Sequence, residues 1–137
     1  MKKYALIVAG GMGKRMENQL PKQFMLLNDK PVLYYTLKTF LDAYEDLQII
    51  LVLPLEYTDM GQEIIDAWFD KDRIRLTAGG DTRFQSVKNG LQLVEGDSII
   101  FVHDGVRCLV TTELIHRCYD QALQTGTAIP VVVCKDS

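Results

Sequence analysis

Short apolar runs rich in β-branched residues alternate along this chain with longer segments of helical periodicity. The runs predict five strands, at Tyr4–Val8, Gln48–Leu53, Arg73–Thr77, Ser98–His103 and Ala128–Cys134. The segments between them predict four helices, at Val32–Ala43, Glu56–Phe69, Thr82–Leu93 and Thr112–Leu123. This alternation is typical of a mostly parallel sheet with helices on both faces. We therefore expect a Rossmann-like α/β fold.

The length of the chain bounds its organisation. Its 137 residues are 47% hydrophobic and 24% charged, which suits one compact core and a single domain over residues 1–137. The last expected strand ends three residues before the final residue, Ser137. Because a sheet rarely ends its chain in this way, we expect a domain that is truncated at its C-terminus.

Charge, hydropathy and cysteine content exclude several classes of function. A net charge of −3 and a pI near 5.3 give no basic excess for nucleic acid or an anionic membrane. No apolar run approaches the roughly 20 residues that cross a bilayer, and the first apolar stretch is too short for a secretory signal. We therefore expect a cytoplasmic protein. The three cysteines have no CxxC spacing, which favours reduced thiols over disulfides or a zinc site.

A glycine-rich loop follows the first expected strand and reads Ala9-Gly10-Gly11-Met12-Gly13-Lys14-Arg15-Met16. Ligands of open α/β sheets bind outside the carboxyl ends of the strands, so the loop lies where a ligand is expected. Its glycines let backbone N–H groups approach phosphate oxygens, and its basic pair adds positive charge. The GKS or GKT ending of a P-loop is missing, and the glycine and acid pattern of a dinucleotide site fits poorly.

Three further segments carry residues suited to nucleotide chemistry. In Pro21-Lys22-Gln23-Phe24, the proline and the aromatic ring would hold Lys22 over the loop. A glycine turn, Gly79–Gly80, leads into a helix whose N-cap is Asp81 or Thr82 and could offer polar groups to a base edge. After the fourth strand, His103-Asp104-Gly105-Val106-Arg107 offers a carboxylate for Mg²⁺ and a guanidinium for phosphate, or a simple ion pair. We interpret His103, which lies within the apolar run, as a hydrogen-bonded structural residue.

These segments together resemble the family of 2-C-methyl-D-erythritol 4-phosphate cytidylyltransferases, enzymes of the non-mevalonate route to isoprenoids with the nucleotide-diphospho-sugar transferase fold. The resemblance rests on the glycine-rich loop with Arg15, the Pro-Lys-Gln-Phe segment, the turn with Arg83, Ser86 and Val87, and the pair Asp104 and Arg107. It implies CTP and a polyol phosphate as substrates, Mg²⁺ as cofactor, and a homodimer of the full-length protein.

The resemblance also implies a role for each site residue. Arg15 and Lys22 would be catalytic and stabilise the transition state. Asp104 would hold the metal and the acceptor, and Arg107 would face the acceptor. The nucleotide would be bound by Ala9, Gly10, Gly11, Gly13, Gly80, Asp81 and Ser86, of which the last three would read the cytosine.

Two features of the sequence keep other interpretations open. Gly105–Val106 and Cys108 stand where the family commonly has Ala-Ala and Pro, and His-Asp-Gly-Val-Arg resembles the sister family of ribitol-5-phosphate cytidylyltransferases. Arg83, in contrast, resembles the methylerythritol family. The expected truncation also allows a non-catalytic nucleotide-binding module. A third alternative is an unrelated flavodoxin-like or dinucleotide-binding domain.

Overall fold

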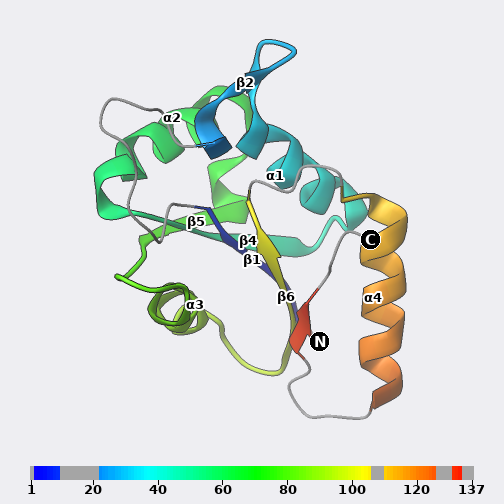
Figure 1. The fold of residues 1–137 in the computed structure, drawn as a ribbon. Coiled ribbons are helices and arrows are strands. Elements are labelled where there is room, and N and C mark those ends of the chain that lie inside the picture. The colour runs from blue at the N-terminus through cyan, green and yellow to red at the C-terminus, as the bar shows by residue number, and fades with distance from the viewer. Residues whose placement is uncertain (1, 10–21, 106–109, 126–130, 134–137) are drawn as a thin grey trace.

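A computed structural model describes residues 2–9, 22–105, 110–125 and 131–133. A five-stranded sheet lies at its centre, with the strand order β5-β4-β1-β6-β7 and parallel pairing between all neighbours (Figure 1). Its strands are β1 (Lys2–Val8), β4 (Leu47–Leu53), β5 (Ile74–Ala78), β6 (Ser98–Asp104) and β7 (Val131–Val133). The helices are α1 (Val32–Ala43), α2 (Thr58–Trp68), α3 (Arg83–Leu91) and α4 (Thr112–Thr125). The expected parallel α/β architecture is confirmed.

The element boundaries agree with the sequence prediction to within a few residues, and α1 has the predicted ends. α2 starts at Thr58 rather than Glu56, because the chain after Pro54 first forms a 3-10 turn at Leu55–Tyr57. α3 ends at Leu91, two residues before the predicted end at Leu93.

A small hairpin was missed by the sequence prediction. It consists of β2 (Leu26–Leu27) and β3 (Lys30–Pro31), joined by Asn28 and Asp29. Both joining residues have positive φ, at 52° and 69°, as a two-residue hairpin turn requires. Strands of two residues are too short to show a periodic pattern, and the Asn-Asp pair was the only local signal.

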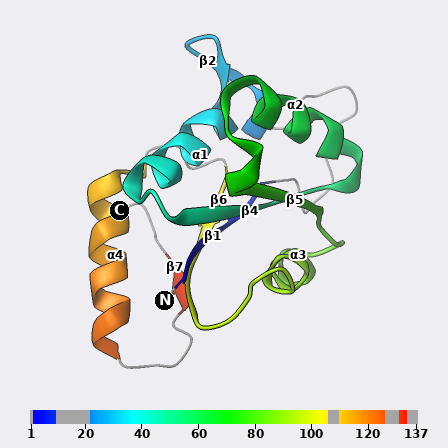
Figure 2. The ribbon, with the colours of Figure 1, turned by 180° about the vertical axis from the view of Figure 1, so that it is seen from behind.

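Alternate residues of the strands build two separate cores, one on each face of the sheet. Ala5 and Ile7 of β1 face α1, α2 and α4, which supply residues such as Phe40, Ile64 and Ile115. Tyr4, Leu6 and Val8 of β1 face the opposite side, where Val87 of α3 packs. Figure 2 shows α3 on the side of the sheet opposite to α1 and α2. Central strands buried on both faces explain why the predicted strands are continuously apolar.

The order of the strands places the candidate site. β4 and β5 lie on one side of β1, whereas β6 and β7 lie on the other, so the direction of winding reverses between β1 and β6. Val8 and Asp104, the last residues of these two strands, are partners in the register. Open α/β sheets bind ligands at such a reversal, outside the carboxyl ends of the strands. Among the described residues, no helix is long and apolar enough to cross a membrane.

Candidate nucleotide site at the carboxyl edge of the sheet

The chain leaves β1 and β6 side by side. Ala9 follows β1, is fully buried, and donates its backbone N–H to the carbonyl oxygen of Val52 at 2.9 Å. Gly105 follows β6 and donates its N–H to the carbonyl oxygen of Val8, also at 2.9 Å. The hydroxyl of Thr36 in α1 donates to the carbonyl oxygen of Gly105 at 3.1 Å. The start of the glycine-rich loop, the start of the segment after β6 and the first turns of α1 are therefore held together.

Asp104 is the last residue of β6 and is half-buried at this edge. The described residues contain no group of three or more His, Cys, Asp or Glu side chains that could hold a metal ion. A lone carboxylate nevertheless fits Mg²⁺, which commonly takes one or two carboxylates and completes its shell with waters and substrate phosphates. His103 precedes Asp104, is 1% exposed and packs its ring against Phe40 at 5.3 Å between centroids. Its burial in the sheet agrees with the structural role expected for it.

The Pro-Lys-Gln-Phe segment forms a 3-10 turn at Lys22–Phe24. Phe24 is 3% exposed, and its ring contacts Tyr57 with centroids 5.5 Å apart, so it anchors the segment as expected. Val32, the first residue of α1, donates its N–H to the carbonyl oxygen of Met25 at 2.8 Å. This bond fixes the backbone that carries Lys22 against the start of α1. Gln23 is 2% exposed, and no described residue accepts a hydrogen bond from its Nε2.

The glycine turn after β5 is bonded on both sides. Gly79 donates its N–H to the carbonyl oxygen of Leu53 at 2.7 Å, and Gly80 donates to the hydroxyl oxygen of Ser86 at 3.1 Å. Ser86 is fully buried beneath the turn. Thr82 is the N-cap of α3, because its Oγ1 accepts the N–H of Gln85 at 3.0 Å, and Asp81 is left exposed.

The structure thus places part of the predicted site. Ala9 and Asp104 lie at the ends of β1 and β6, and Gly80, Asp81 and Ser86 lie where β5 passes into α3. The backbone of Lys22 is described, but its side chain is not. Gly10, Gly11, Gly13, Arg15 and Arg107 lie outside the described residues. Gln85 and Asn89 of α3, which the sequence prediction did not assign to the site, contact the glycine turn.

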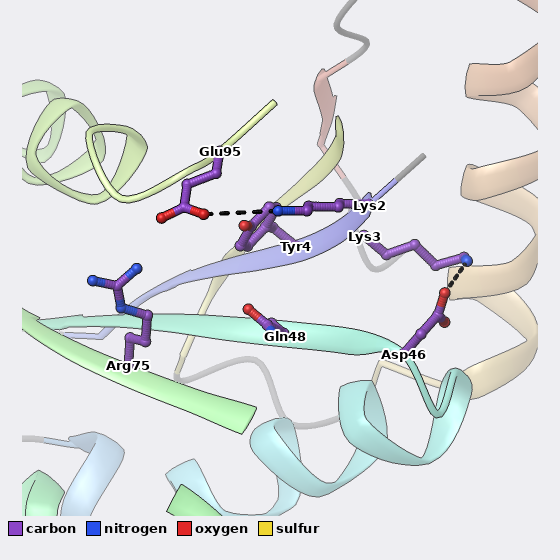
Figure 3. A pocket seen from close by; sticks show the side chains of 7 residues that line it. All are labelled: Lys2, Lys3, Tyr4, Asp46, Gln48, Arg75 and Glu95. Atoms are coloured by element: carbon purple, nitrogen blue, oxygen red, sulfur yellow. Dashed lines mark hydrogen bonds and ion pairs between the residues drawn. The ribbon is translucent and has the colours of Figure 1, made fainter. Parts of the chain in front are cut away.

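Two hollows lie away from this edge. One, of about 180 Å³, is surrounded by charged and polar side chains at the amino ends of the strands, including Lys2, Gln48, Arg75 and Glu95 (Figure 3). Lys2 and Glu95 form an ion pair across it at 3.7 Å. The other, of about 340 Å³, is mainly apolar and lies between Phe24 and α2. The first is at the edge of the sheet opposite to the candidate site, so its position does not fit the nucleotide.

Comparison with known proteins covers nearly the whole chain. The family model of 2-C-methyl-D-erythritol 4-phosphate cytidylyltransferase matches residues 4–137. A curated 2-C-methyl-D-erythritol 4-phosphate cytidylyltransferase of Bacteroides thetaiotaomicron is 48% identical over 132 residues, which cover 96% of this chain and 60% of the relative. The chain therefore spans about three fifths of the length of the curated relatives it matches.

Solved structures agree with the sequence comparison. The 2-C-methyl-D-erythritol 4-phosphate cytidylyltransferase of Francisella tularensis matches with a TM-score of 0.72 at 30% identity, over 92% of this chain and 54% of that one. The 4-diphosphocytidyl-2C-methyl-D-erythritol synthase of Anaerococcus prevotii matches with a TM-score of 0.72 at 29% identity, over 88% of this chain and 50% of that one. This chain belongs to the 2-C-methyl-D-erythritol 4-phosphate cytidylyltransferase family.

Proposed function

We propose that the protein containing this chain transfers CMP from CTP to 2-C-methyl-D-erythritol 4-phosphate and releases pyrophosphate. The observation that carries the proposal is the register pairing of Val8 with Asp104 at the reversal of strand order. It brings the start of the glycine-rich loop and a carboxylate to one point on the sheet edge, as a site for a triphosphate and an acceptor requires. Family membership decides against an unrelated flavodoxin-like or dinucleotide-binding domain.

The reaction is expected to be a direct in-line displacement. An oxygen of the acceptor phosphate attacks the α-phosphorus of CTP, the bond to the bridging oxygen breaks, and pyrophosphate leaves. An acceptor phosphate is already anionic near neutral pH, so no general base is needed. Catalysis then depends on positioning and on neutralising the charge of the phosphoryl oxygens. We propose that Arg15 and Lys22 neutralise the charge of the phosphoryl oxygens. This role explains why the expected catalytic residues are cations rather than His or Cys.

The proposal includes a metal ion, Mg²⁺, with Asp104 as its protein ligand and Arg107 facing the acceptor. When bound, Mg²⁺ would offset negative charge on the phosphate oxygens. The half-buried position of Asp104 at the end of β6 supports this assignment. A homodimer of the full-length protein and a cytoplasmic location complete the proposal and rest on the family resemblance.

A second candidate acceptor is ribitol 5-phosphate. It is favoured by Gly105, which is closely packed against Ala9 and Leu33 and stands where the methylerythritol family commonly has alanine. The test is pyrophosphate release by the full-length protein with CTP and Mg²⁺, with each acceptor supplied separately. Release with methylerythritol phosphate alone supports the proposal, and release with ribitol phosphate alone replaces it. CTP binding without turnover on either acceptor would instead identify a non-catalytic nucleotide-binding module.

A further inference from the structure

We propose that Gln85 and Asn89 are positioning residues that hold the Gly79–Gly80 turn in the form that recognises the cytosine base. The inference rests on the proposed function and deepens it, because it assigns base selectivity to two side chains that do not belong to the four sequence motifs. Both lie one turn apart on the side of α3 that meets the end of β5.

The peptide unit between Ala78 and Gly79 is fixed from two opposite sides. Its N–H, on Gly79, donates to the carbonyl oxygen of Leu53 in β4 at 2.7 Å. Its carbonyl oxygen, on Ala78, accepts the Nδ2 of Asn89 at 3.2 Å. β5 is an edge strand among the described residues, so a carbonyl that points away from β4 has no strand to pair with. Asn89 takes the place of that missing neighbour.

Gln85 determines which way the Asn89 amide points. The Nε2 of Gln85 donates to the Oδ1 of Asn89 at 2.8 Å, across one turn of α3. An amide whose oxygen is engaged on this side must present its NH₂ group on the other, toward Ala78. The two side chains therefore form a chain of hydrogen bonds from the exposed surface of α3 to the last peptide of β5.

Gln85 also packs directly against the glycine turn. A Cβ added at Gly80 would overlap the Cγ of Gln85, and one added at Gly79 would lie 2.5 Å from the Oγ of Ser86. Gly80 is in addition bonded to Ser86 through its N–H. The turn thus rests directly on the first turn of α3, with two N–H groups and one carbonyl already paired. A recognition element that is ordered before the ligand arrives loses less conformational entropy on binding.

The experiment uses the full-length protein that contains this chain and measures the affinities for CTP and UTP by calorimetry. Asn89→Ala removes the bond to Ala78, and Asn89→Asp keeps the size and an acceptor for Gln85 but removes the donor. We expect both variants to bind CTP about five- to tenfold more weakly, the effect of losing one well-placed hydrogen bond. We also expect the preference for CTP over UTP to fall, because a loosened turn discriminates less between base edges.

Gln85→Ala should weaken CTP binding by a smaller factor than Asn89→Ala, because it loosens the Asn89 amide without deleting it. Gln62→Ala is the matched control, since Gln62 donates to Asp66 at 2.9 Å in the same one-turn arrangement on α2, remote from the turn. We expect this control to bind both nucleotides as the parent does. In steady-state kinetics the Asn89 variants should raise KM for CTP and leave KM for the acceptor unchanged, a split that a general loss of stability would not produce.

The outcomes separate the two levels of the proposal. If the parent protein binds CTP selectively and both Asn89 variants keep its affinity and its CTP to UTP ratio, the positioning role is wrong and the proposed function stands. If the variants lose affinity for CTP and UTP equally, or raise both KM values together, the role is structural and the inference is overturned. If the parent protein does not bind CTP, the proposed function fails, and the inference falls with it.

Discussion

The N–H of Gly105 donates a hydrogen bond of 2.9 Å to the carbonyl oxygen of Val8, and this bond joins the chain beyond β6 to the end of β1. The contact needs a residue without a side chain. A Cβ added at Gly105 would overlap the Cβ of Ala9 and lie 3.3 Å from the Cδ1 of Leu33. Close approach, rather than an unusual φ, therefore explains the glycine at the point where the candidate site begins.

Replacing Gly105 by alanine is expected to lower the free energy of unfolding by about 1–3 kcal/mol, the usual effect of an extra methyl group in a packed site. Urea unfolding of the parent and variant measures the difference. Ala9→Gly removes the methyl group that the new side chain would strike, so the double variant should recover part of the loss. Simple additivity of the two changes would show that Gly105 and Ala9 do not compete for the same space.

Arg15→Ala and Lys22→Ala are each expected to reduce kcat of the full-length enzyme by about a hundred- to a thousandfold, since each removes a preorganised donor to the phosphoryl oxygens. Pyrophosphate release with CTP and the acceptor measures the loss. Lys71→Ala, in an exposed 3-10 turn outside the candidate site, is the charge-matched control and should retain the parent rate. Unchanged turnover in both Arg15 and Lys22 variants would contradict the cytidylyltransferase assignment.

Gln23→Met is expected to leave the free energy of unfolding unchanged or to raise it by about 1 kcal/mol. The substitution keeps the length of the side chain and removes a buried Nε2 for which the described part of the chain offers no hydrogen-bond partner. A buried polar group that lowers stability is expected where ligand binding requires that group. Because Gln23 lies beside Lys22, KM for CTP should rise in the same variant. Gln62→Met on the exposed face of α2 controls for the substitution itself. A clear loss of stability with unchanged KM would show that Gln23 serves the fold alone.

The ion pair between Lys3 and Asp46 gives a pH prediction. The Nζ of Lys3 donates to Oδ2 of Asp46 at 2.8 Å and lies 5.1 Å from the ring centroids of Tyr44 and Tyr119. The hydrogen bond from Lys3 lowers the pKa of Asp46 below its usual 3.8, and the same bond raises the pKa of Lys3 above 10.5. Burial raises the pKa of Tyr44 to about 12, so its phenol is protonated at pH 7, where Lys3 and Asp46 are both charged.

The sign of each shift determines where the pair contributes to stability. The contribution of Asp46 is present above its ordinary pKa and is lost as pH falls through the lowered one, and that of Lys3 is lost only as pH rises through its raised pKa. Lys3→Met should return the Asp46 pKa toward 3.8 in an NMR titration. At pH 7 it should lower the free energy of unfolding by at most about 1 kcal/mol, because Asp46 is largely exposed. Lys38→Met, which removes the exposed partner of Asp42, should leave the Asp46 titration unchanged.

The sequence by itself determined the elements, and it predicted the chemistry of their ends. The boundaries of α1 were predictable because Leu33, Leu37 and Phe40 repeat at helical spacing and are all buried. The strands were predictable because those inside the sheet are buried on both faces and therefore apolar throughout. The glycine-rich loop, the lysine segment, the glycine turn and the acid after β6 could be predicted as site segments from the local sequence, because phosphate and metal chemistry require particular residue types at short spacing.

Only the tertiary structure decided which of these ends meet. The order of the strands brought Val8 beside Asp104, and it left β5 at an edge where the carbonyl of Ala78 is bonded by Asn89. No local pattern marks the bond of Asn89 to Ala78 or the close contact of Gly105 with Ala9, because each depends on a residue of another element. Propensity and periodicity indicate which residues of a segment are buried. Contacts between different elements form only once the helical connections have determined which strands are neighbours.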